Sequence, residues 1–95
     1  MNTEEIYNLK LFVTGMSITS VRAIENIKVI CEKYLRDQYK LEIIDIHKDP
    51  GSLQKYDIIA CPTLIKKSPG VFKKLIGDLS NEDKVLNGLG INTEK

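Results

Sequence analysis

Hydrophobic residues return along this chain with two different spacings. In the segment 7–14, Leu9, Leu11 and Val13 occupy alternate positions, and a repeat of two residues is typical of a strand with one buried face. In the segment 20–36 the spacing changes to three and four residues, which is typical of an amphipathic helix. These segments therefore predict a strand followed by a long helix. The apolar stripe of the helix would consist of Val21, Ile24, Ile27, Cys31 and Leu35.

The remaining sequence predicts three more strands and two more helices. The second strand is expected to run parallel to the first through a right-handed crossover, because a long helix separates the two. The third and fourth strands are expected to form an antiparallel hairpin, since a Ser-Pro-Gly turn lies between them. The expected strands cover 41–46, 63–66 and 71–76, and the expected helices cover 52–59 and the residues after the cap Ser80, as far as Gly88 and Gly90.

The order of these elements defines a fold class. The sequence β-α-β-α-β-β-α, with two parallel strands followed by a hairpin, is the layout of α/β domains of the thioredoxin-like type. We expect one domain over residues 1–95, with flexible ends at 1–6 and 91–95. The last helix is the weakest element, because a helix shorter than about 12 residues depends on packing for its stability.

Pro62 separates the second expected helix from the third strand. A proline cannot donate to a sheet, so it is typical of a strand's first residue or of an edge. Two interpretations stay open from the residues. Pro62 is either a trans proline that starts a strand, or a cis proline that faces the mouth of a thioredoxin-like sheet.

Composition and charge exclude several function classes. The chain carries 14 Lys and Arg residues against 13 Asp and Glu residues, a balance that is unlike the basic excess of dedicated nucleic-acid binders. No apolar run approaches the roughly 18 residues of a membrane span, and the polar, acidic start of the chain is no signal peptide. We therefore expect a cytoplasmic protein that binds neither nucleic acid nor membranes.

The two cysteines do not form the pair that thiol oxidoreductases of this fold require. Such enzymes need a cysteine pair where the first helix begins, and this chain has Gly15-Met16-Ser17-Ile18-Thr19-Ser20 there. Cys31 lies on the apolar stripe, so we expect a buried structural thiol. Cys61, beside Pro62, could act alone, and this leaves a redox or stress-response protein as the alternative function.

No other constellation of residues predicts catalysis. His47 is the only histidine, so it has no second imidazole for a metal pair, and we expect it on a solvated loop. Metal and cofactor sites are not predicted, nor is a catalytic residue. The expectation is therefore a protein that is not an enzyme and acts by binding.

Basic residues are concentrated around the expected hairpin. Lys66 and Lys67 precede its turn, and Lys73 and Lys74 follow it. One interpretation is edge protection, because lysines keep an edge strand from pairing with other chains. The other interpretation is a cationic patch for an acidic partner surface. Nucleic acid is a weaker option, because no aromatic residues are interleaved for stacking.

Several motifs lie between about Tyr7 and Leu89. They are Leu9-Lys10-Leu11-Phe12-Val13-Thr14-Gly15, Ser20-Val21-Arg22-Ala23-Ile24, Ile43-Ile44-Asp45-Ile46, Lys48-Asp49-Pro50, Ala60-Cys61-Pro62-Thr63-Leu64, Ile76-Gly77-Asp78-Leu79-Ser80, Lys84-Val85-Leu86 and Gly88-Leu89. Taken together, these motifs closely resemble the KaiB family of circadian clock regulators.

The resemblance implies a non-enzymatic regulator with several clock partners. It would bind the N-terminal ATPase ring of a KaiC-like hexamer, and the complex would capture KaiA and engage clock histidine kinases. The family also implies fold switching. A tetramer, or a dimer, would hold a rearranged C-terminal half, and a thioredoxin-like monomer would bind KaiC. A sensor-type domain of a clock histidine kinase, which shares the fold, is a further alternative.

The resemblance also assigns roles to residues. Arg22, Lys66, Lys73 and Lys74 match basic positions that we expect to contact the partner, and Pro62, Pro69, Gly88 and Gly90 are the expected fold-switch positions. This chain departs from the family in a reduced proline run at Ser68-Pro69-Gly70-Val71 and in a nearly absent acidic tail. These changes disfavour the tetramer, and the helix-start signal at 80–83 together with Gly90 leads us to expect the thioredoxin-like state to predominate.

Overall fold

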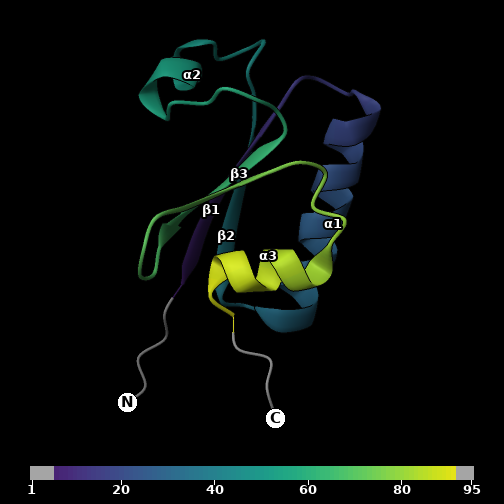
Figure 1. Ribbon diagram of the computed structural model, residues 1–95, viewed down its shortest axis with the longest axis vertical. Helices are drawn as coiled ribbons and strands as arrows, with labels where there is room; N and C mark the ends of the chain where they lie inside the picture. The colour runs from purple at the N-terminus through teal and green to yellow at the C-terminus, as the bar shows by residue number, and fades with distance from the viewer. Residues whose placement is uncertain (1–5, 92–95) are drawn as a thin grey trace.

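The computed structural model describes residues 6–91, and the expectation of flexible ends at 1–5 and 92–95 lies outside the described residues. The element order is the predicted β-α-β-α-β-β-α (Figure 1). The elements are β1 (Tyr7–Val13), α1 (Ile18–Tyr34), β2 (Tyr39–Asp45), α2 (Gly51–Lys55), β3 (Thr63–Ser68), β4 (Lys73–Ile76) and α3 (Glu82–Leu89).

The strands form one mixed sheet in the order β2-β1-β3-β4. β1 and β2 are parallel, with Tyr7 opposite Tyr39. β3 is antiparallel to both β1 and β4. The structure therefore confirms the predicted parallel pair and the predicted hairpin, and the thioredoxin-like fold class with them.

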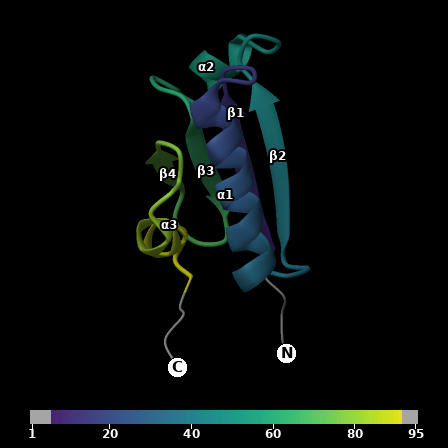
Figure 2. The same ribbon diagram turned by 90° about the vertical axis from the view of Figure 1, so that its right-hand side faces the viewer.

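Both faces of the sheet carry a hydrophobic cluster. On one face, Leu9, Leu11 and Val13 pack against α1 and α3, which lie along the same side of the sheet in Figure 2. On the other face, the buried residues are Phe12, Ile58 and Ile65. The prediction of a single buried face on β1 was therefore too narrow, because α2 and the segment after it cover Phe12.

The long helix begins earlier than the sequence pattern predicted. Ser17 caps α1, since its hydroxyl oxygen accepts a hydrogen bond from the Ser20 amide at 3.2 Å. Ser20 is instead fully buried, and its hydroxyl oxygen accepts from the Thr14 amide at 3.1 Å. This bond ties the end of β1 to the first turn of α1. Cys31 is fully buried, as predicted.

The predicted position of the N-cap of the last helix was also wrong, by one residue. Asn81, not Ser80, caps α3 by accepting from the Lys84 amide at 3.1 Å. Gly88 lies inside the helix and does not stop it. Gly90 ends α3 in the left-handed conformation, with φ of 73°, which glycine adopts at little steric cost.

α2 is shorter than predicted and covers only one end of its sheet face. It ends at Lys55, and Asp57 then takes a positive φ of 56°. The turn is closed by a hydrogen bond from the Ile58 amide to the Leu53 carbonyl at 2.8 Å. In Figure 1, α2 lies at one end of the molecule and α3 lies toward the other.

Candidate functional site

The two thiols lie in environments that keep them protonated. Burial raises the pKa of Cys31 to about 12, with a smaller contribution from the nearby Glu32 carboxylate. Burial also raises the pKa of Cys61, which is partly exposed. A thiol that attacks disulfides needs a large thiolate fraction near neutral pH. This chemistry disfavours the alternative in which Cys61 acts as a redox centre.

We expect Cys61 to react slowly with alkylating reagents. Its iodoacetamide reaction rate, followed by mass spectrometry across pH, should rise with a midpoint above the ordinary thiol value of 9.0, because burial disfavours the thiolate. Free N-acetylcysteine is the control and should react faster at neutral pH. A midpoint near or below pH ~7, as in activated cysteines, would contradict this prediction.

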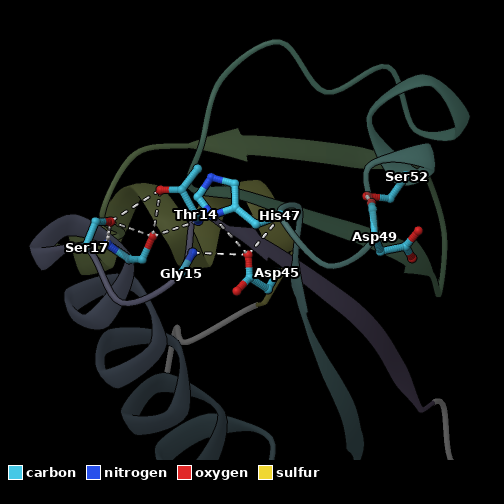
Figure 3. Close-up of polar contacts among 8 residues, drawn as sticks. Thr14, Gly15, Ser17, Asp45, His47, Asp49 and Ser52 are labelled. Atoms are coloured by element: carbon cyan, nitrogen blue, oxygen red, sulfur yellow. Dashed lines mark hydrogen bonds and ion pairs between the residues drawn. The ribbon is translucent and has the colours of Figure 1, made fainter.

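A polar cluster joins the ends of β1 and β2 to the start of α1 (Figure 3). One oxygen of the Asp45 carboxylate accepts hydrogen bonds from the His47 amide at 2.9 Å and the Gly15 amide at 3.2 Å. These bonds, the His47 amide first, lower the pKa of Asp45. The Ser17 hydroxyl donates to Ser20 at 2.8 Å.

The contacts of this cluster are structural and do not build a nucleophilic site. The His47 imidazole lies 3.8 Å from the Asp45 carboxylate, and no hydroxyl within residues 6–91 makes a hydrogen bond to it. His47 itself is exposed, as predicted for a loop residue. The cluster therefore holds the Gly15 loop in place without activating Ser17 or Thr14.

The structure separates the four basic residues that the family resemblance assigned to partner contact. Arg22, Lys73 and Lys74 are exposed, but Lys66 is 6% exposed, so its expected place on an open patch is wrong. The Lys66 ammonium donates to the Pro69 carbonyl at 2.7 Å and is enclosed by its own turn. Neighbouring strand residues point to opposite faces, so Lys73 shares the α1 face with Lys66, and Lys74 lies on the α2 face.

Arg22 and Lys74 each lie close to an acidic residue. The Ser80 hydrogen bonds lower the pKa of Asp78, and the Arg22 charge adds to this effect. The Lys74 ammonium donates to the Asp57 carbonyl at 2.8 Å and lies 3.9 Å from its carboxylate. Both cations remain available to solvent.

The expected fold-switch positions Pro62, Pro69 and Gly90 lie at junctions of the C-terminal half, and Gly88 lies inside α3. The bonds before Pro62 and Pro69 are both cis, which answers the question that the sequence left open for Pro62. Pro62 precedes β3, and Pro69 lies in the β3–β4 turn. A Cβ atom on Gly88 would lie 2.5 Å from the Leu75 side chain, so α3 packs very closely on β4 there.

A group of lysines surrounds Tyr56, and of its members only Lys67 belongs to the basic cluster that the sequence predicted around the hairpin. The ammonium groups of Lys10, Lys55 and Lys67 lie 5.9, 5.5 and 5.9 Å from the centre of its ring. These residues come from three different elements, so no sequence motif contains them. A further sequence signal is that Lys10 lies on the polar positions of β1.

Residues 6–91 contain no helix that is long and apolar enough to cross a membrane. Histidine, cysteine, aspartate and glutamate side chains do not gather there in the groups of three that a metal site requires.

The fold and the site define a thioredoxin-like domain without the thiol pair of the redox enzymes. Among solved structures, the N-terminal domain of SasA from Synechococcus elongatus matches with a TM-score of 0.75 at 21% identity, over 100% of this chain and 93% of that one. Mitochondrial thioredoxin 3 from Saccharomyces cerevisiae matches with a TM-score of 0.72 at 15% identity, over 92% and 79% of the two chains. At these identities the matches show the fold alone.

Proteins related by sequence match this chain at higher identity than the solved structures do. The family model of the KaiB domain matches residues 10–91. The circadian clock protein KaiB3 of Synechocystis sp. is 47% identical over 87% of this chain and 81% of its own length. The circadian clock oscillator protein KaiB of Gloeothece citriformis is 44% identical over 96% and 87%. The chain belongs to the KaiB family.

Proposed function

We propose that this protein is a non-enzymatic clock-type regulator in the cytoplasm, which binds the N-terminal ATPase ring of a KaiC-like hexamer and modulates its phosphorylation and ATPase cycle. The observation that carries the proposal is family membership over residues 10–91. The relatives are named as circadian clock proteins. KaiA and clock histidine kinases are the further partners in this proposal.

The thioredoxin-like monomer is the proposed binding state. The complete capping of α3 supports it, with Asn81 at one end and Gly90 at the other. Buried Val85, Leu86 and Leu89 fix the helix to the main core. We further propose that the half beginning near Pro62 has a second arrangement in a tetramer, since two packings of one sequence can differ by only a few kcal/mol.

The proposed contact surface uses the exposed cations Arg22, Lys73 and Lys74. Lys66 takes an indirect role in this proposal, because its ammonium is committed to the Pro69 carbonyl and shapes the turn before β4. Lysine at 73 and 74 supplies charge without the planar fork of arginine. Such surfaces affect the association rate and its salt dependence most strongly.

The function is tested by mixing the protein with a KaiC-type hexamer and ATP, followed by size exclusion or native mass measurement. Rapid complex formation supports the partner and a populated binding state. Formation over hours supports the partner but places refolding first, because a rare competent state lowers the apparent affinity. The absence of any complex with KaiC relatives contradicts the proposed function.

Reversing two of the proposed contact charges should weaken that complex. We expect the double variant Lys73→Glu with Lys74→Glu to raise the Kd for the hexamer by about tenfold or more, with most of the change in the association rate. The matched control is Lys28→Glu with Lys48→Glu, which makes the same change in net charge at exposed positions elsewhere. Equal weakening in both double variants would show that net charge matters and the proposed surface does not.

A further inference from the structure

The sheet face opposite α1 carries a groove that the proposed function does not use. Two hollows of about 410 and 400 Å³ lie on this face, and Lys10 and Glu42 line both of them. The first hollow extends to Lys40 and Lys67, and the second extends to Lys55 and Tyr56. We call the two hollows together the lysine groove. Arg22 and Lys73 do not line it.

The groove exists because α2 is too short to cover the whole face. Its five residues cover the end of the sheet that holds Phe12 and Ile65. At the other end, β1, β2 and β3 present side chains that no helix of the described residues covers. Lys10 is paired with Glu42 across β1 and β2, and strand alternation places Lys67 on the same face.

Positive charge predominates in the lysine groove. Among residues 6–91, four lysines line it against two carboxylates, those of Glu42 and Asp49. Glu42 is already paired with the Lys10 ammonium, whose hydrogen bond lowers the pKa of that carboxyl. In the part of the chain that the structure describes, no salt bridge neutralises the remaining lysines. These are Lys40, Lys55 and Lys67.

The arrangement of these cations favours several spaced carboxylates over one compact anion. Lys40, Lys10 and Lys67 come from the neighbouring strands β2, β1 and β3, and neighbouring strands are about 4.8 Å apart. Alternate side chains of an extended peptide are about 7 Å apart, so carboxylates on one side of such a peptide can meet cations spread across the strands. The groove contains no arginine fork that would grip a single phosphate.

We propose that the lysine groove binds an extended, acidic segment of a partner protein. The lysines attract the carboxylates, and Tyr56 keeps three of the ammonium groups close together through its ring face. Nucleic acid fits the groove less well, because Tyr56 is the one aromatic residue among its described lining residues and cations already surround that ring. This proposal is independent of KaiC binding and of the surface at Arg22 and Lys73.

The first test measures binding of a fluorescein-labelled peptide of alternating glutamate and serine to the full chain, by anisotropy at about 50 mM salt. The test variant is Lys40→Glu with Lys67→Glu, and the matched control is Lys28→Glu with Lys48→Glu. All four lysines are exposed. We expect the test variant to raise the Kd by about tenfold and the control by less than about threefold. Equal loss in both, or no loss in the test variant, overturns the proposal.

The second test locates the peptide by amide NMR shifts. We expect shifts at Lys10, Lys40, Tyr56 and Lys67, with Arg22 unchanged. Shifts centred on Arg22 overturn the proposal, and so does tighter binding of tripolyphosphate or single-stranded DNA than of the peptide at the same residues. The milder variant Lys40→Gln with Lys67→Gln keeps the test valid if charge reversal disturbs folding. It should weaken peptide binding by about threefold or more.

Discussion

Replacing Phe12 with alanine is expected to lower the free energy of unfolding by about 3–5 kcal/mol. Phe12 is fully buried in the smaller cluster, which has only two other buried members, Ile58 and Ile65. Its ring lies 5.2 Å from the Tyr56 ring, measured between centres. Ile44 and Ile65 beside the ring lie on β2 and β3, whose pairing in the sheet limits their movement, so a cavity should remain.

The measurement is urea unfolding followed by circular dichroism, with Phe72→Ala as the matched control. Phe72 is 49% exposed, so the same chemical change should cost less than about 1 kcal/mol there. A similar loss of stability in the two variants would mean that the α2 face holds no independent core. Loss of Phe12 should also disturb Tyr56 and hence the lysine groove.

The second large effect is expected for Leu89→Ala. Leu89 is 1% exposed and fixes α3 to the main core. Truncation of a buried leucine costs about 2–5 kcal/mol, and this helix has only eight residues. We therefore expect the loss to fall first on α3, because so short a helix depends on its packing.

NMR chemical shifts test this prediction directly. The helical shifts of residues 82–89 should diminish in Leu89→Ala, while those of α1 persist. Binding to the KaiC-type hexamer should weaken in proportion to the fraction of molecules in which α3 is unfolded. Val29→Ala is the control, since Val29 is 61% exposed on α1. Simultaneous loss of the α1 and α3 signals would contradict the independent behaviour of α3. Extended shifts with a tetrameric mass in the unmodified protein would contradict the predominance of the thioredoxin-like state.

The elements were predictable because their signals are local. Alternation along β1 and the three-and-four spacing along α1 follow from the geometry of each element, and a long helix supplies the crossover that a parallel pair needs. The helix boundaries were predicted less well. Ser17 and Ser20 are both acceptable caps by type, and the choice between them depends on the bond from the Thr14 amide to Ser20.

The candidate site was predicted only in part, because charge in a sequence does not reveal where a side chain points. Arg22, Lys73 and Lys74 are exposed as expected, but Lys66 is folded back onto Pro69 within its own turn. The lysine groove was missed because Lys10, Lys55 and Lys67 are brought together by β1, α2 and β3. No separation along the chain would have grouped them.

By itself, the sequence determined the order of elements, the parallel first pair, the buried Cys31 and the absence of a thiol pair at the start of α1. The tertiary structure decided which side chains are available. It buried Phe12 beneath α2, enclosed Lys66 in its turn, and left one end of a sheet face open as the lysine groove. The physical reason is that periodicity and capping act between residues close in the chain. The exposure of a side chain and the electrostatic field around it depend instead on elements that are distant in the chain and pack against it.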